Sequence, residues 1–266
     1  MLKDITLGQY FPGNSLIHRL DPRTKILCII LYITVIFCVK NFWGYGVLAA
    51  FTAICIISSK IPFGYVIKGV KPILIFVIFT ALFNLFLTNG RVLWSWGFLK
   101  ITYEGVRLAA FMVLRLFFLV LGTSLLTLTT SPIALTDGIE KLLSPFKKIG
   151  VPAHELAMMM TIALRFVPTL LEETEKIIKA QTARGADFES GNIINRAKAM
   201  IPILIPLFVS AFRRADDLAV AMECRCYRGG ENRTRLKELK MTTADIWGWL
   251  FVTVLAVLVF TSNILL

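Results

Sequence analysis

The sequence lacks the short motifs that carry chemistry in most enzymes. It has no G-x-x-x-x-G-K-[ST] phosphate loop, no H-E-x-x-H metal-binding pair and no G-x-S-x-G nucleophile turn. Only two histidines occur, His18 and His154, so candidates for a general base or a metal ligand are few. These absences exclude an ATPase or a metalloprotease. They predict a chain that is not an enzyme and holds no catalytic residue, metal or cofactor of its own.

Charged residues are scarce, and this scarcity indicates the class of protein. They make up 17% of the chain and hydrophobic residues 56%, whereas soluble domains average about 25% and about 45–50%. Only a membrane accommodates both deviations, so we expect an integral membrane protein. The formal net charge is +12. In an apolar chain this excess predicts cytoplasmic loops and contact with anionic lipid, and no nucleic-acid partner.

The five cysteines do not form a recognisable framework. Cys28, Cys38 and Cys55 lie in apolar runs, and Cys224 and Cys226 form an isolated C-x-C pair without a nearby histidine. Neither a disulfide scaffold nor a zinc site is indicated.

Five apolar stretches are long enough, or nearly long enough, to cross a bilayer. A helix needs about 20 residues for this, because each residue rises about 1.5 Å. The predicted spans are residues 26–40, 41–59, 72–90, 107–130 and 246–266. The first crosses only if Lys25 and Lys40 at its ends reach the interface, or if the polar residues Thr24 and Asn41 lie in the interface. The runs are continuous rather than alternating, so the predicted fold class is all-α, a polytopic membrane protein with about five transmembrane helices.

Residues 132–245 form an unusual segment between the N-terminal membrane region, residues 1–131, and the final span. The segment carries 17 of the 29 basic residues and 14 of the 17 acidic ones, and it contains no Ser/Gly-rich linker. We therefore expect a folded helical domain inserted before the last span. By the positive-inside rule, this domain and the N-terminus are predicted to be cytoplasmic.

Two long amphipathic helices are predicted in this segment. One covers residues 153–184 with a kink at Pro168, and the other covers residues 193–226 with bends at Pro202 and Pro206. Each has one apolar stripe at i, i+3, i+4, i+7 spacing and one charged side. The stripes comprise Val167, Leu170, Leu171, Thr174, Ile177, Ile178 and Gln181 in the first helix, and Leu207, Phe208, Ala211, Ala215, Leu218, Ala219 and Met222 in the second.

Each of these helices ends in an arginine between two small residues. The two triplets are Ala183, Arg184 and Gly185, and Cys224, Arg225 and Cys226. A guanidinium at a helix end projects beyond the helix, and small neighbours let a partner with a carboxylate-lined groove approach closely. A single arginine near a helix C-terminus is explained more simply by the helix dipole. Because the pattern occurs twice, we favour a two-pronged docking element.

Arg115 lies about 12 Å into the fourth predicted span, counted from Arg107. A charge at this depth either contacts a substrate or ion, or is an interior arginine satisfied by a carbonyl or by Asn84. The second explanation is favoured, since no other charged side chain lies deep in the spans.

Several short motifs, in their order along the chain, resemble the transmembrane T component of energy-coupling factor transporters, which are importers of the ATP-binding-cassette class. These motifs are His18-Arg19-Leu20-Asp21-Pro22-Arg23-Thr24-Lys25, Ser131-Pro132, Glu155-Leu156, Ala163-Leu164-Arg165-Phe166-Val167-Pro168, Ala180-Gln181 before Ala183-Arg184-Gly185, and Ala221-Met222-Glu223 before Arg225 and Tyr227. The match covers nearly the whole chain. It is closest to T components of Gram-positive bacteria that serve several substrate-binding subunits.

The resemblance implies a multi-pass scaffold in a bacterial cell membrane with two kinds of partner. Two ABC-type ATPase subunits would hold ATP and Mg, and a small membrane-embedded S component, interchangeable in some systems, would bind the substrate. Each arginine triplet would end a coupling helix that inserts into an ATPase groove. The family commonly has alanine and glycine around the second arginine. Cys226 lacks the backbone freedom of that glycine, so a different local helix end is an alternative here.

The predicted function is to transmit ATP hydrolysis by the two ATPases to the substrate-binding subunit, for uptake of a vitamin or micronutrient. A self-sufficient secondary transporter is the alternative; it would be expected to show inverted repeats and ionisable residues at the bilayer midplane, and the spans show no repeat. A membrane-anchored adaptor is a third possibility. The sequence does not indicate the transported compound, because by resemblance the specificity pocket lies in another chain.

Overall fold

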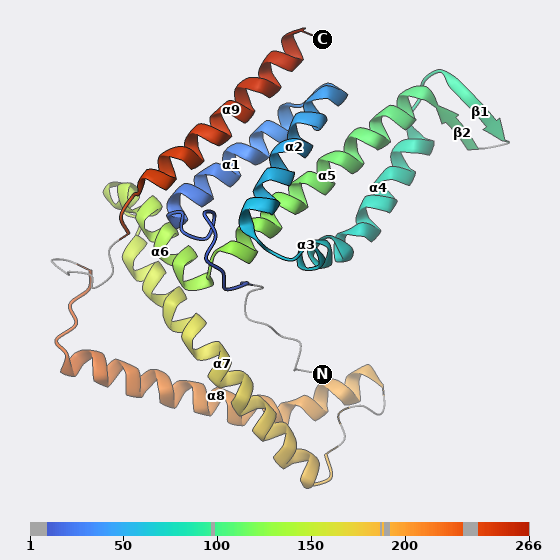
Figure 1. The fold of residues 1–266 in the computed structure, drawn as a ribbon. Coiled ribbons are helices and arrows are strands. Elements are labelled where there is room, and N and C mark those ends of the chain that lie inside the picture. The colour runs from blue at the N-terminus through green and yellow to red at the C-terminus, as the bar shows by residue number, and fades with distance from the viewer. Residues whose placement is uncertain (1–9, 97–98, 187, 189–191, 231–238, 266) are drawn as a thin grey trace. The chain divides into compact units, whose positions relative to one another are not determined.

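The computed structural model describes residues 10–96, 99–186, 188, 192–230 and 239–265 (Figure 1). Its secondary structure is almost entirely helical, which confirms the predicted all-α class. The chain divides into two compact units. One unit comprises residues 10–138 and 239–265, and the other comprises residues 139–230, so that the boundary falls inside α6 (Pro132–Leu143).

Four helices form the bundle of the first unit. They are α1 (Pro22–Cys38), α2 (Phe42–Ser59), α5 (Tyr103–Thr129) and α9 (Thr243–Leu265). Although α9 is the last helix of the chain, it packs beside α1 and α2 (Figure 1). The buried core contains Tyr32, Val35, Ile36, Leu48, Phe118, Leu121, Leu125, Leu255 and Val259. In a lipid environment such close packing, rather than removal of apolar surface from water, holds helices together.

The third predicted span is longer than expected. Helix α3 (Phe63–Val70), the 3₁₀ turn η1 (Lys71–Ile73) and α4 (Leu74–Leu87) follow one another directly, and α3 and α4 pack against α5. The continuous helical stretch therefore begins at Phe63, before the predicted start of the span at Pro72. Pro72 lies inside the 3₁₀ turn, near the start of a helical segment, where a residue without a backbone N–H is tolerated.

A small β-hairpin, which the sequence pattern did not predict, joins α4 to α5. Strands β1 (Val92–Trp96) and β2 (Leu99–Thr102) pair in antiparallel register, with an irregularity between Val92 and Trp94. The hydroxyl of Thr102 then caps α5 by accepting a hydrogen bond from the Gly105 amide at 3.1 Å.

Six helical stretches of the described chain are long and apolar enough to cross a membrane. These are Phe42–Ser59, Phe63–Leu87, Tyr103–Thr129, Ala153–Ala183, Ile194–Cys224 and Thr243–Ile264. The predicted count of about five changes for two reasons. Helix α1, predicted as the first span, has only 17 residues. Two helices that we expect outside the bilayer from their charges satisfy the requirement by length and composition.

Lys25 is the main surprise in α1. The helix begins at Pro22 because the Asp21 carboxylate accepts a hydrogen bond from the Arg23 amide at 2.9 Å. The Lys25 side chain points inward and is 7% exposed, rather than extending outward from the helix end. Its Nζ donates to the Thr129 carbonyl at 2.9 Å and to the Thr130 hydroxyl at 3.2 Å. These groups form the C-terminal end of α5, where the helix dipole favours a cation.

Helix α9 is tied to both ends of α1. Near its start, the Asp245 carboxylate is 2% exposed and accepts a hydrogen bond from the Asp21 amide at 2.7 Å. Near its end, the Asn263 amide donates to the Cys38 carbonyl at 2.8 Å. The last helix therefore completes the bundle through buried polar contacts as well as apolar packing.

The second unit contains the end of α6, the 3₁₀ segment η2 (Ser144–Ile149), α7 (Ala153–Ala183) and α8 (Ile193–Cys224). The two long helices expected from the sequence are confirmed. Pro168 lies within α7, and Pro202 and Pro206 lie within α8, without ending either helix. The two helices pack on each other and cross (Figure 1).

Candidate functional site

The candidate site consists of the two helix ends with the small-Arg-small pattern. At the end of α7, Gly185 adopts the left-handed conformation with φ of 87°. Its amide donates to the Thr182 carbonyl at 2.9 Å, and the Ala186 amide donates to the Gln181 carbonyl at 3.0 Å. This pair of hydrogen bonds is a Schellman motif, which stops a helix cleanly and satisfies its last carbonyls.

The end of α8 has the same geometry although no glycine is present. Cys226 adopts a left-handed conformation with φ of 55°. Its amide donates to the Glu223 carbonyl at 2.8 Å, and the Tyr227 amide donates to the Met222 carbonyl at 3.1 Å. The alternative of a different second helix end is therefore wrong. The hydrogen bonds hold Cys226 in a conformation that a non-glycine residue adopts only at a cost.

Both arginine side chains are available to a partner. All six predicted residues, Ala183, Arg184, Gly185, Cys224, Arg225 and Cys226, are exposed. Within the described part of the chain, neither guanidinium makes a hydrogen bond or an ion pair. The thiols of Cys224 and Cys226 are free as well. Among the described residues, the structure thus presents two exposed cationic groups without a partner, each at the end of a long helix.

The two arginines lie near opposite ends of α7. The segment after α8 returns to the start of α7, where the Tyr227 hydroxyl lies 3.3 Å from Nε2 of His154. Nδ1 of the same imidazole lies 3.1 Å from the Glu140 carboxylate. Arg225 is therefore close to the first turn of α7, whereas Arg184 follows its last turn. The helix has 31 residues, which places the two groups about 45 Å apart along its axis.

The mutual packing of α7 and α8 covers only part of their apolar surface. The seven predicted stripe residues of α7 are all half-buried, and so are Leu207, Ala211, Leu218 and Met222 of α8. Phe208, Ala215 and Ala219 of the predicted α8 stripe are exposed instead. An ion pair between Arg214 and Glu173, 3.0 Å apart, also links the helices.

A second apolar face on α8 is left uncovered, and we call it the α8 face. It consists of Ile201, Leu204, Ile205, Phe208, Val209 and Phe212, all exposed and repeating at helical spacing. Such a contiguous apolar surface marks an interaction site with protein or lipid.

Arg115 is not paired with Asn84. The Asn84 amide donates to the Thr80 carbonyl in its own helix at 2.9 Å, and the Arg115 guanidinium lies 5.4 Å from the centre of the Phe37 ring. Its Nε is buried without a hydrogen-bond partner in the described structure. Of the two predicted partners, a carbonyl or Asn84, Asn84 is therefore excluded, and a cation–π contact with Phe37 of α1 stabilises the side chain.

Sequence reasoning missed the contacts of Tyr227 and Asp245. Tyr227 is close in sequence to the second arginine, and His154 is one of only two histidines, so both residues could have been singled out. Their proximity could not, because 73 residues separate them. Asp245, likewise, is the sole charge at the start of an apolar run, but its partner Asp21 lies 224 residues away.

Fold and site together define a multi-pass, all-α membrane protein with a helical unit that presents unpaired arginines and uncovered apolar surface. Comparison with known proteins identifies the kind of membrane protein. The family CbiQ, described as cobalt transport protein, matches residues 13–236.

Relatives named energy-coupling factor transporter transmembrane protein EcfT match almost the entire chain. The protein of Clostridium kluyveri is 60% identical over 266 residues, covering 99% of this chain and 98% of its own. That of Ruminiclostridium cellulolyticum is 59% identical over 246 residues, 92% of each chain. That of Bacillus subtilis is 49% identical over 261 residues, 98% of each. The chain belongs to this family and is a transmembrane component of an energy-coupling factor transporter.

Proposed function

We propose that the protein is the scaffold through which two ATPase subunits drive a substrate-binding membrane subunit during uptake of a vitamin or micronutrient. The observation that carries the proposal is the repeated helix end. Arg184 and Arg225 leave helices of similar length through the same hydrogen-bonded geometry, and both guanidiniums are exposed and unpaired. Two equivalent groups about 45 Å apart suit two separate partners better than one small ligand.

Each guanidinium is proposed to enter a carboxylate-lined groove of one ATPase subunit. The planar fork of arginine binds a carboxylate through two parallel hydrogen bonds, and the short side chains beside it leave room for the groove walls. Movement of the ATPases would then be passed along α7 and α8 as rigid levers, since the helices are packed together and linked by the Arg214–Glu173 pair.

The substrate-binding subunit is proposed to pack on the α8 face. That surface is large, apolar and rich in phenylalanine, as expected for an interface with another membrane protein. The pocket that selects the transported compound is proposed to lie in this substrate-binding subunit rather than in this chain, so one scaffold can serve different substrates.

The helical unit is further proposed to lie on the cytoplasmic side, where ATP is available. Charged residues along α7 and α8 support this placement, because each would cost about 2.5–3.5 kcal/mol at the centre of a bilayer. A membrane-impermeant maleimide should therefore label Cys224 and Cys226 in inside-out vesicles and leave them unlabelled in right-side-out vesicles. Labelling from the outer face would contradict the orientation.

The docking proposal is tested with the variant Arg184→Ala/Arg225→Ala in the assembled complex. If each arginine is buried against a carboxylate, its removal costs about 2–5 kcal/mol, so ATPase binding should weaken by about 30-fold or more per site. We expect loss of ATP-driven uptake into vesicles and loss of co-purified ATPases, with normal insertion in the membrane. Arg213→Ala is the matched control, because Arg213 is an exposed arginine on α8 away from the helix end. Wild-type uptake by the double variant would refute the proposal.

A further inference from the structure

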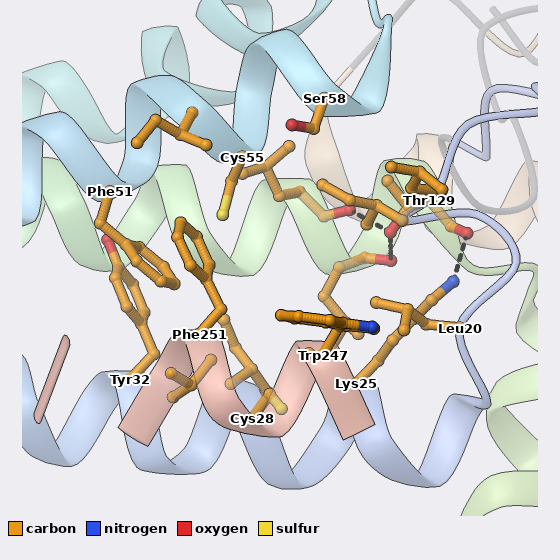
Figure 2. Close-up of a pocket in the computed structure, with 18 of the residues that line it drawn as sticks. Leu20, Lys25, Cys28, Tyr32, Phe51, Cys55, Ser58, Thr129, Trp247 and Phe251 are labelled. Carbon is orange, nitrogen blue, oxygen red and sulfur yellow. Dashed lines mark hydrogen bonds between the residues drawn. The ribbon is translucent and has the colours of Figure 1, made fainter. Parts of the chain in front are cut away.

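A cavity with a volume of about 680 Å³ lies inside the bundle of the first unit, between α1, α2, α5 and α9 (Figure 2). This volume is within the range of about 300–1,000 Å³ that is typical of small-molecule sites. The walls are largely apolar and include Ile29, Leu125, Leu126 and Leu250. The cavity plays no part in the docking proposal, since both arginine triplets belong to the other unit.

The two ends of the cavity differ in polarity. Figure 2 shows Lys25, Ser58, Thr129 and Trp247 gathered at one end, which we call the polar end. At the other end three aromatic rings stack: the centre of the Phe51 ring lies 4.7 Å from that of Phe251 and 5.8 Å from that of Tyr32. The ends are seven residues apart on both α1 and α2, which corresponds to about 10 Å. A ligand that fits must therefore have a polar head and an apolar tail.

Positive charge predominates at the polar end. The Lys25 ammonium donates to two carbonyls and one hydroxyl, and no described carboxylate lies within ion-pair distance of it. Arg19, directly before the cavity-lining Leu20, and Lys60, two residues after Ser58, are exposed and add to this charge. Asp21 and Asp245 lie on the same side of the bundle and are negatively charged, but Arg23 lies 3.7 Å from the Asp21 carboxylate and offsets it, so Lys25, Arg19 and Lys60 outnumber the remaining carboxylate of Asp245. The balance at the polar end is complementary to an anion.

We propose that this cavity binds one acyl chain of an anionic phospholipid, with the phosphate at the polar end. Three of the surrounding helices, α2, α5 and α9, are long and apolar enough to cross a membrane, so lipid is the ligand at highest local concentration. Basic pockets between transmembrane helices are a known mode of recognising anionic headgroups. The indole N–H of Trp247, a side chain that is 70% exposed, is a donor for the headgroup. The Lys25 ammonium, whose three protons are donated to protein groups, attracts the phosphate through its charge.

The proposal is tested by native mass spectrometry of the full-length protein in detergent, titrated with phosphatidylglycerol or with phosphatidylcholine of the same chain length. One ammonium near a phosphate contributes about 1 kcal/mol, so phosphatidylglycerol should bind about fivefold more tightly. Ser58→Phe fills the cavity and should abolish tight binding. Ala53→Phe is its matched control, because Ala53 is an exposed residue of α2 outside the cavity. Lys25→Gln should remove the preference for the anionic lipid and Lys25→Arg should retain it.

The native cysteines provide a second measurement that does not depend on the Lys25 variants. Cys28 and Cys55 line the cavity from α1 and α2, whereas Cys38 does not. Phosphatidylglycerol should slow alkylation of Cys28 and Cys55 by N-ethylmaleimide and leave Cys38 unchanged. Equal binding of both lipids, binding of free fatty acid without binding of phospholipid, or binding that survives Ser58→Phe would overturn the proposal. The proposal would also be overturned if the wild-type protein bound no lipid and Ser58→Phe prevented assembly with the substrate subunit.

Discussion

Exchanging the left-handed residues of the two helix ends tests how each helix is stopped. The exchange consists of two single variants, Cys226→Gly and Gly185→Cys. Both positions have positive φ, 55° and 87°, and each is held by the same pair of hydrogen bonds. At Gly185 an added Cβ would meet nothing within 4 Å. Any effect there must come from the backbone conformation rather than from a clash.

The size of the effect follows from the cost of the left-handed conformation, about 1–2 kcal/mol for a residue with a side chain. Gly185→Cys should therefore destabilise the end of α7 by about that amount. Cys226→Gly should stabilise the end of α8 by about 1 kcal/mol. This gain is smaller than the full cost of the left-handed conformation, because glycine loses more conformational freedom when it becomes ordered. Cys226→Ala is the control that removes the thiol but keeps the Cβ, and it should give no gain.

Hydrogen exchange followed by mass spectrometry measures these local openings. The relevant amides are those of the left-handed residue and the next residue at each helix end, because they donate the closing hydrogen bonds. A change of 1–2 kcal/mol corresponds to about a five- to thirtyfold change in exchange rate. Exchange should be faster in Gly185→Cys and slower in Cys226→Gly. Slower exchange in Gly185→Cys together with faster exchange in Cys226→Gly would refute the reasoning from backbone conformation. Equal protection by Cys226→Ala and Cys226→Gly would refute it as well.

Three further substitutions test the packing of the two units. Gly122→Ala should destabilise the bundle by about 1–3 kcal/mol, because the new Cβ would overlap a tyrosine ring of α1; Gly46→Ala, where nothing lies within 4 Å, should leave the thermal midpoint unchanged or raised. Asp245→Ala should cost about 2–4 kcal/mol, since it leaves two backbone amides without an acceptor; Asp245→Asn should cost less, and equal midpoints for the two variants would contradict this. Glu173→Gln should cost less than about 1 kcal/mol, because the pair with Arg214 is partly exposed, and a larger loss in chemical denaturation would show that the pair is worth more than we infer.

The positions of the helices could be predicted because they depend on local chemistry. Asp21 and Pro22 mark the start of α1, and the 3.6-residue spacing of apolar residues marks α7 and α8 to within a few residues at their ends. The β-hairpin was missed because it is short and follows directly on an apolar helix. Contacts between distant residues, such as Asp21 with Asp245, leave no local pattern, so the inward direction of Lys25 and the closure of the bundle by α9 could not be predicted.

The two arginine motifs could be found because the pattern is repeated, but their geometry could not. Glycine at position 185 predicts a left-handed residue, whereas cysteine at position 226 predicts none. The common hydrogen-bond pattern at both ends emerges only from the structure. The cavity, similarly, depends on how α1, α2, α5 and α9 pack together, which no short stretch of sequence specifies.

Only 6% of the most apolar stretch of α7, and the same share of α8, is buried within the chain. A copy of the chain without a binding partner would expose this apolar surface in the cell, where it would promote aggregation and degradation by quality-control proteases. Any protein that covers α7 and α8 would add its binding energy to the stability of the fold. We expect the cellular amount of this chain to follow the supply of whichever companion is scarcest, with the excess degraded.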